Sequence, residues 1–229
     1  MQNKNKIVII IALILVIGGL AYYEANYHIN NISYTTLGNT SIGTVEKGIS
    51  GNASADTTIA LITGIHPRET LSIEPEIQAA REFGSNDVKI IHYKVTVTDR
   101  PEDYDVGRAN GESLVEEFVN PDVTQSDAQA VVISHSHNPD YGVGFYVATP
   151  EMDNASVDMA EKINQTSDFN YYPVTGNETY KSTSAVLVSK PIAQAGYPTL
   201  VYEIPEDITE QTATSKTKEL FEMICKIVS

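Results

Sequence analysis

The sequence predicts an α/β fold in which a mixed, largely parallel sheet lies between two layers of helices, preceded by one N-terminal transmembrane helix. From residue 57 to the C-terminus, short β-branched segments alternate with segments of helical periodicity, which is typical of a three-layer αβα domain. An uncharged apolar segment at residues 7–23 predicts the transmembrane helix. The chain has 229 residues, 41% apolar and 20% charged, so we expect one globular domain with appendages.

The apolar segment at residues 7–23 follows two lysines. Basic residues on the amino side keep that end in the cytoplasm, so residues 1–6 are predicted to be a cytoplasmic N-terminus. The rest of the chain then lies outside a single-pass cell-membrane anchor. A cleaved signal peptide is the alternative, because residues 19–21 (Gly-Leu-Ala) are a small-residue cleavage site. In that case the protein is secreted.

Residues 24–56 are rich in Asn, Ser, Thr and Gly and show little periodicity. We predict a polar stalk or linker here, with an edge strand considered around residues 32–37. The domain itself is predicted to span residues 57–229.

The first half of this domain alternates strand and helix. Thr57–Thr63 (TTIALIT) is apolar and β-branched and ends at Gly64, as a buried strand does. Glu69–Phe83 carries apolar residues at helical spacing after a proline, so it is predicted to be a helix. Val88–Val97 is predicted to be the second strand, and Gly111–Phe118 a short helix.

The second half continues the alternation. Val186–Ala195 is predicted to be helical in spite of its β-branched residues, because a Gly-Tyr-Pro turn follows it. The other predicted strands are Ala130–Ser134, Gly144–Ala148 and Thr199–Ile204, and the other predicted helices are Ser156–Asn164 and the amphipathic Thr212–Val228.

Charge and cysteine content exclude several kinds of site. The net charge of −15 argues against nucleic acid as a partner, because phosphate binding needs clustered Lys and Arg. Cys225 is the only cysteine, which excludes disulfides within the chain and thiolate metal clusters. Any metal site must therefore be built from histidines and carboxylates.

Three predicted strands lead to residues that suit a metal-dependent hydrolase. His66 and Glu69 follow the first strand, His135 follows the third, and Glu203 lies in the last. Ligands of open α/β sheets bind beyond the carboxyl ends of the strands, so we expect these side chains to converge. Two histidines and a carboxylate leave a fourth metal position for water, which is the open geometry of catalytic zinc.

The third ligand is His135 or His137, and strand periodicity does not choose between them because both lie on one side of an extended strand. His135 is favoured because it lies nearer the predicted strand end. Glu203 interrupts an apolar strand, where an ionised carboxylate is rarely left without a reason. A neighbouring metal ion would supply one.

Residues 64–69 (Gly-Ile-His-Pro-Arg-Glu) resemble the Gly-x-His-x-x-Glu zinc motif of the zinc carboxypeptidase superfamily. His135-Ser136 is similar to the segment that carries the third ligand, and residues 202–204 (Tyr-Glu-Ile) to the strand with the catalytic Glu. Order and spacing suit the compact succinylglutamate desuccinylase/aspartoacylase-like branch better than the longer carboxypeptidase A-like enzymes. The resemblance covers the chain from about residue 57 to its end.

The resemblance implies hydrolysis at one Zn²⁺ ion, held by His66, Glu69 and His135. Glu203 would act as the general base, taking a proton from water and passing it to the leaving amine. Arg108 resembles the family's oxyanion arginine, with Arg100 as the rival. The predicted substrate-binding residues are Arg68, Ser136, His137 and Tyr180, the last placed upstream of Glu203 like the family's mobile tyrosine.

One departure bears on specificity. Val115-Glu116 stands where the family has an Asn-Arg pair that grips a substrate carboxylate. A Glu there would repel a carboxylate, so strict carboxypeptidase specificity is not expected. The sequence thus predicts an extracytoplasmic zinc hydrolase of a peptide or amide bond, with cell-envelope material as one candidate substrate. Two alternatives stay open: a deacylase of small N-acyl amino acids, and a non-catalytic binding module on the same fold.

Overall fold

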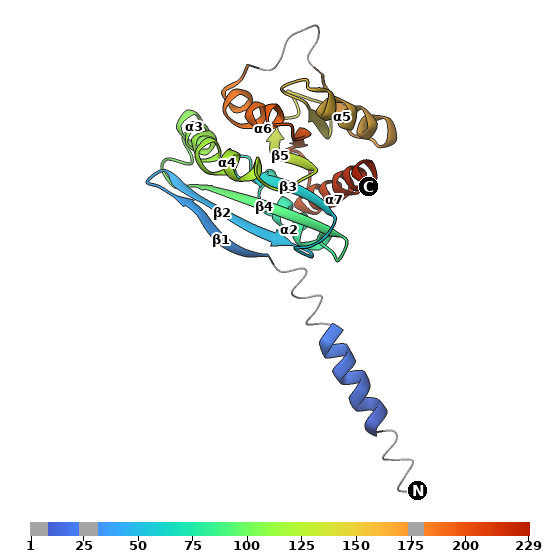
Figure 1. Cartoon of the computed structure of the whole chain (residues 1–229). Helices are drawn as coiled ribbons and strands as arrows, with labels where there is room; N and C mark the ends of the chain where they lie inside the picture. Colours follow the sequence, from blue (N-terminus) through green and yellow to red (C-terminus); the bar gives the residue numbers. More distant parts are fainter. Residues whose placement is uncertain (1–8, 23–31, 174–180) are drawn as a thin grey trace, which may run out of the picture.

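The computed structural model describes residues 9–22, 32–173 and 181–229. Within these ranges eight strands form one mixed sheet in the order β1-β2-β4-β3-β5-β8-β6-β7 (Figure 1). The four central strands β4, β3, β5 and β8 are parallel, and antiparallel pairs join them to β2 and to β6. The strands are β1 (Ser33–Asn39), β2 (Gly43–Ser50), β3 (Thr57–Thr63), β4 (Val88–Val97), β5 (Ala130–His137), β6 (Tyr146–Ala148), β7 (Asn170–Tyr171) and β8 (Thr199–Pro205).

Helices cover both faces of this sheet, so the predicted three-layer α/β architecture is confirmed (Figure 1). Helices α2, α5 and α7 pack on one face, and α3, α4 and α6 pack on the other. Three short helical turns, η1 to η3, adjoin these helices. The helices and turns are η1 (Thr70–Ser72), α2 (Glu74–Phe83), α3 (Tyr104–Leu114), η2 (Val115–Val119), α4 (Asn120–Val123), α5 (Asn154–Thr166), η3 (Ala185–Ser189), α6 (Lys190–Gln194) and α7 (Glu210–Val228).

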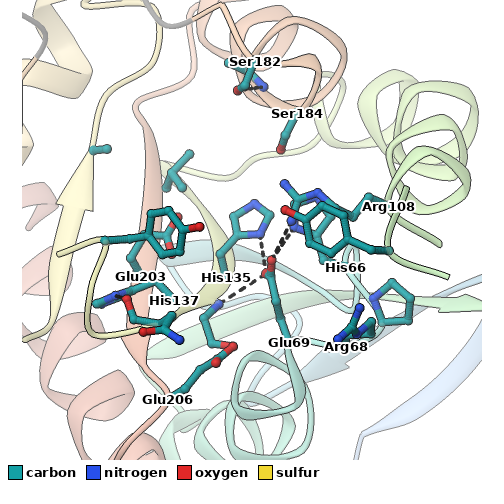
Figure 2. Close-up of a pocket in the computed structure, with 18 of the residues that line it drawn as sticks. His66, Arg68, Glu69, Arg108, His135, His137, Ser182, Ser184, Glu203 and Glu206 are labelled. Carbon is teal, nitrogen blue, oxygen red and sulfur yellow. Dashed lines mark hydrogen bonds and ion pairs between the residues drawn. The ribbon is translucent and has the colours of Figure 1, made fainter. Parts of the chain in front are cut away.

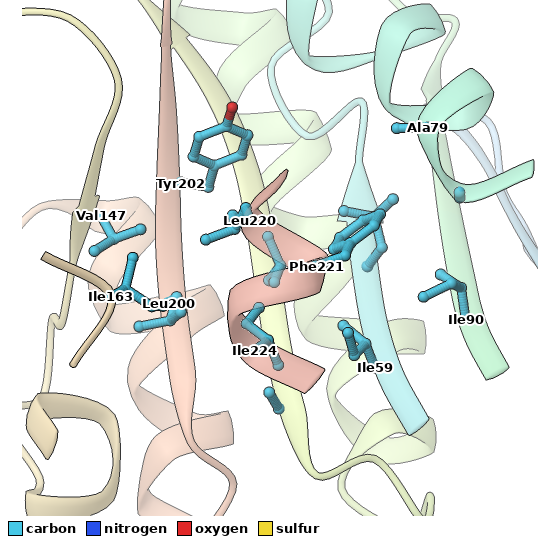
Figure 3. Packing of buried hydrophobic residues seen from close by; sticks show 14 of the residues in the cluster. Ile59, Ala79, Ile90, Val147, Ile163, Leu200, Tyr202, Leu220, Phe221 and Ile224 are labelled. Atoms are coloured by element: carbon cyan, nitrogen blue, oxygen red, sulfur yellow. The ribbon is translucent and has the colours of Figure 1, made fainter. Parts of the chain in front are cut away.

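The central strands are apolar on both sides because both faces of the sheet are covered. Along β3, Ile59 and Leu61 join the apolar cluster beneath α2 and α7, whereas Ala60 and Ile62 join the cluster beneath α3 and α6. Phe221 of α7 is fully buried in the first cluster (Figure 3). This arrangement explains why these strands read as continuous apolar runs instead of alternating patterns.

The predicted polar stalk at residues 24–56 is corrected by the structure over β1 and β2, which form an antiparallel hairpin at the edge of the sheet. Gly48 of β2 lies between Tyr34 of β1 and His92 of β4 in the strand register. Because Gly48 has no side chain, the Tyr34 hydroxyl reaches His92 Nδ1 at 2.5 Å, and His92 Nε2 lies 2.8 Å from the Thr63 hydroxyl. These two contacts join the hairpin to the core.

The N-terminal apolar segment is helical over residues 9–22, and its large side chains are exposed, with Leu15 at 70%. Across the described ranges, no helix has both the length and the apolar character that a membrane crossing needs. Residues 7, 8 and 23 of the predicted transmembrane segment lie outside the described residues, as do residues 1–6 and 24–31.

Some helix boundaries differ from the predictions. Helix α3 begins at Tyr104 instead of Gly111, because the side chain of Asp103 caps it by accepting a hydrogen bond from the Val106 amide. The predicted helix Glu69–Phe83 is divided into η1 and α2, with a proline in the first turn of α2. The earlier start of α3 places Arg108 inside a helix instead of before one.

Candidate metal centre

A cavity of about 600 Å³ opens at the carboxyl ends of β3, β5 and β8, on the α3 side of the sheet. The predicted metal ligands and the predicted general base all line it (Figure 2). This position is the one expected for ligands of an open α/β sheet. The residues that line the cavity include His66, Arg68, Glu69, Tyr104, Arg108, His135, Ser136, His137, Glu203 and Glu206.

The turn after β3 carries His66 and Glu69 into the cavity. Gly64 has a φ of 79°, and a Cβ there would lie 2.1 Å from the Val95 carbonyl oxygen, so the turn requires glycine. Gly111 of α3 packs so closely that a Cβ would lie 1.7 Å from the Ile65 carbonyl oxygen. The two glycines therefore let the backbone bend sharply and let α3 approach this segment directly.

Glu69 is the centre of the site, and its carboxylate contacts both histidines (Figure 2). His66 Nδ1 lies 2.7 Å from Oε1, and His135 Nδ1 lies 2.8 Å from Oε2. The Ser136 amide and the Arg108 guanidinium also donate to this carboxylate, at 3.3 Å and 3.0 Å. One carboxylate thus links segments from β3, β5 and α3.

The residues His66, Glu69 and His135 fit a metal ion. One ligand atom from each lies within 4.8 Å of the others, and two histidines with one carboxylate are a typical catalytic zinc set. Neither His137 nor any other described histidine belongs to this group. The structure therefore brings together the three residues that the sequence singled out as ligands.

Glu112 of α3 supports the same conclusion from behind His66. This buried carboxylate lies 3.3 Å from His66 Nε2. When Nε2–H donates to Glu112, the neutral ring presents a lone pair at Nδ1 toward Glu69 Oε1, and two such atoms need a proton or a cation between them. The arrangement matches the carboxylate–histidine pairs that orient metal-bound imidazoles.

Glu112→Gln is expected to weaken zinc binding about 10- to 100-fold, because an amide orients the His66 ring less strongly than a carboxylate does. The measurement is a competition titration against a chromogenic chelator. Ser113→Ala, at the exposed neighbouring position of α3, is the matched control and should leave the affinity unchanged. Equal affinities for Glu112→Gln and wild type would exclude the orienting role.

The histidines and carboxylates at the centre shift one another's pKa values. Burial disfavours a charged His66, but its hydrogen bonds to the carboxylates of Glu112 and Glu69 outweigh burial and raise its pKa above the ordinary value. Burial likewise disfavours ionised Glu69, yet the charges and hydrogen bonds of His135 and His66 hold its pKa well below the ordinary range. Glu69 is therefore ionised, as a metal ligand must be.

Glu203 lies beside His135 on the neighbouring parallel strand, in direct register with it. Burial raises the pKa of Glu203 to about 7, and the negative charges of Glu69 and Glu206 act in the same direction. His135 and Arg108 oppose the shift. A carboxylate that titrates near neutral pH can both accept and release a proton, which suits a general base.

The predicted cationic residues also line the cavity. Arg108 donates to Glu69, and its guanidinium lies 5.3 Å from the centre of the Tyr104 ring. Arg68 lies 5.8 Å from the same ring. Tyr104 is 58% exposed, so the two arginines and this ring form one rim of the cavity. Arg100 is absent from the described lining of the cavity.

The remaining predicted residues have mixed positions. His137 lines the cavity, but its ring nitrogens lie 3.0 Å and 3.1 Å from the backbone oxygens of Asn138 and Gly144. The Ser136 hydroxyl donates to Glu206 at 3.2 Å. Tyr180 lies outside the described residues.

The inference drawn from Val115-Glu116 is corrected. Val115 is fully buried in the core and Glu116 is exposed, and neither is among the described residues that line the cavity. Glu116 therefore does not repel a substrate carboxylate in this cavity. Both residues lie in the π-helical turn η2, which begins at Val115.

Sequence reasoning missed Glu112, Tyr104 and Glu206. Glu112 lies one helical turn after Arg108, so both project from one face of α3. Recognising the Asp103 cap would have extended the predicted helix and exposed this relation. Glu206 follows β8 directly and carries no comparable signal.

Comparison with known proteins supports the fold. No family model matches the sequence, and no curated protein matches it. Among solved structures, a metallo-carboxypeptidase from Burkholderia cenocepacia is similar with a TM-score of 0.59 and 14% identity, covering 89% of this chain and 66% of its own. A candidate carboxypeptidase A from Shewanella denitrificans has a TM-score of 0.61 and 12% identity, covering 92% and 69%.

A product-bound cell shape determinant protein from Helicobacter pylori is also similar, with a TM-score of 0.53 and 10% identity, covering 80% of this chain and 55% of its own. The chain thus spans less than two thirds of the length of this protein and of the Burkholderia structure. The fold is that of metallo-carboxypeptidase-like proteins, as the sequence motifs predicted.

Proposed function

We propose that this protein is a zinc-dependent hydrolase that cleaves a peptide or amide bond. The observation that carries the proposal is the convergence of His66, Glu69 and His135 within 4.8 Å, in a cavity that also contains Glu203. The likeness of the fold to metallo-carboxypeptidases agrees with this chemistry.

The chain's own residues supply the proton transfer and the charge stabilisation. A bound zinc ion would acidify water and polarise a carbonyl group. Glu203 accepts the proton of the attacking water and delivers it to the leaving amine, which its pKa of about 7 permits. Arg108 lines the same cavity, and its positive charge would stabilise the oxyanion that forms during the attack.

The substrate end that binds in the cavity is not proposed to be strictly a free carboxylate. Among the described lining residues the Lys and Arg side chains are Arg68 and Arg108, and Arg108 already donates to Glu69. This leaves Arg68 as the one described lining cation for a substrate carboxylate, in place of the Asn-Arg pair that the family uses. Arg68, Ser136, His137 and Tyr180 remain the proposed substrate-binding residues.

The proposed location is the outer side of a cell membrane, with the N-terminal segment as a single-pass anchor. The uncharged apolar sequence at residues 7–23 and the exposed apolar side chains of helix 9–22 support it. Material of the cell envelope is the substrate that such a tethered hydrolase reaches. Secretion after signal cleavage is the alternative.

The test is a hydrolysis panel with purified full-length protein and added zinc. It contains peptides with free or blocked termini and N-acyl amino acids, each measured with and without a chelator. Chelator-sensitive cleavage of a peptide or amide supports the proposal. Cleavage confined to small N-acyl amino acids would favour a deacylase, and no cleavage by zinc-loaded protein would favour a binding module.

A further inference from the structure

A small polar cluster lies in the apolar core on the face of the sheet opposite the cavity. Glu76 of α2 is fully buried there and hydrogen-bonds with Thr217 of α7. Ser134 of β5 and Tyr202 of β8 face the same cluster, and the Tyr202 ring projects from β8 into this core (Figure 3). A buried carboxyl group in such a core needs a physical account.

The position of this cluster relates it to the candidate metal centre. Side chains of neighbouring strand residues point to opposite faces, so Ser134 lies behind His135 and Tyr202 lies behind Glu203. Glu76 stands in the first turn of α2, the helix that follows Glu69 and η1. On both β5 and β8, the cluster residue therefore immediately precedes a residue of the candidate metal centre.

The hydrogen bonds around Glu76 are compatible with a neutral carboxylic acid. The Thr217 hydroxyl contacts Glu76 Oε1 and also lies 3.0 Å from the Ala213 carbonyl oxygen. A hydroxyl group has one hydrogen, and a carbonyl oxygen only accepts. Both contacts are satisfied when Thr217 donates to Ala213 and a protonated Glu76 donates to Thr217. Burial agrees with this state, because it raises the pKa of Glu76 to about 8.

We propose that Glu76 is a positioning residue of the candidate metal centre, which as a neutral acid joins α2 to α7 behind β5 and β8 and so fixes Glu69 relative to His135 and Glu203. The inference rests on the proposed function, since it takes Glu69 and His135 as zinc ligands. Glu76 touches neither the ligands nor the substrate cavity. It acts through the placement of α2.

Ionisation of Glu76 would remove the carboxyl hydrogen that Glu76 donates to Thr217, and so would weaken the contact between α2 and α7. Glu76 Oε2 has no hydrogen-bond partner among the described residues, so a carboxylate there would be buried with one oxygen unpaired. The Thr217 and Ser134 hydroxyls favour the ionised form of Glu76, but the cost of burial outweighs them. The titratable groups that act on Tyr202 are Glu76 itself, Glu219 of α7 and Asp168, and Lys216 pairs with the last two. Burial raises the pKa of Tyr202 well above its ordinary value, so Tyr202 stays neutral as Glu76 ionises.

The experiment measures zinc affinity by chelator competition across pH, with full-length wild type, Glu76→Gln and Glu76→Leu. Glutamine donates to Thr217 at every pH, so its affinity should match wild type near neutral pH and exceed it increasingly above about pH 8. Leucine should weaken binding about tenfold near neutral pH. Glu74→Gln, at an exposed position of the same helical turn, is the control and should follow wild type.

Circular dichroism establishes folding under each condition. A constant ratio of affinities for Glu76→Gln and wild type across pH would overturn the inference. So would wild-type affinity in a folded Glu76→Leu variant; if that variant does not fold, the pH dependence of the ratio decides alone. A wild type that binds no zinc would instead overturn the proposed metal site, and this inference with it.

Discussion

Wild-type protein offered zinc at neutral pH is expected to carry about one zinc ion per chain, whereas His66→Ala and His135→Ala should carry almost none. Each substitution removes one of three donors whose atoms lie within 4.8 Å of one another. It also leaves the Glu69 carboxylate without one of its two histidine partners. We expect the affinity to fall by more than about a hundredfold, beyond the usual cost of losing an outer-shell partner. Elemental mass spectrometry of purified protein measures the metal content.

His137→Ala is the matched control for this experiment. His137 lies two positions along β5 from His135 and lines the same cavity, but its ring contacts the backbone oxygens of Asn138 and Gly144. The variant should therefore keep its zinc. Zinc lost from His137→Ala and kept by His135→Ala would exchange their roles, and folded wild type without zinc would remove the metal site altogether.

The central sheet and the convergence of the site could be predicted from sequence because their signals are local. Thr57–Thr63 and Val88–Val97 are β-branched runs with clear ends, and β3 and β4 have those bounds. The strand-end rule then placed His66, His135 and Glu203 together without any knowledge of their contacts. Residues 64–69, which follow β3 and include His66 and Glu69, were also predicted as ligands by their resemblance to the Gly-x-His-x-x-Glu motif.

The features that escaped prediction depend on contacts between distant segments. The edge hairpin is joined to the core because the Tyr34 side chain extends across Gly48 to His92. No local sequence pattern predicts this contact between distant segments. The polar composition of β1 and β2 instead indicated a linker. Likewise, Glu116 lies in a π-helical turn and faces solvent, whereas the resemblance to the family motif implied a role in the cavity.

Glu203→Gln is expected to lower kcat/KM about a thousandfold on any substrate that the wild type cleaves, because glutamine cannot accept the proton of the attacking water. KM should change little, since the loss lies in the transition state. The variant should keep its zinc, because Glu203 is outside the group of three ligands. Steady-state kinetics beside metal analysis measures both, with Glu206→Gln at the same cavity as the control. Full activity in folded, zinc-loaded Glu203→Gln would exclude Glu203 as the base.

The pH dependence of kcat/KM tests the role of Glu203 independently. Glu203 works as a base only when ionised, and burial raises its pKa to about 7, so kcat/KM should fall about tenfold per pH unit below that pKa. A bound divalent cation favours the ionised carboxylate, so the acidic inflection should lie at or below about pH 7. In Glu203→Gln the residual activity should lose this inflection, because glutamine does not titrate. An inflection that persists unchanged in the variant would assign it to another group and would exclude Glu203 as its source.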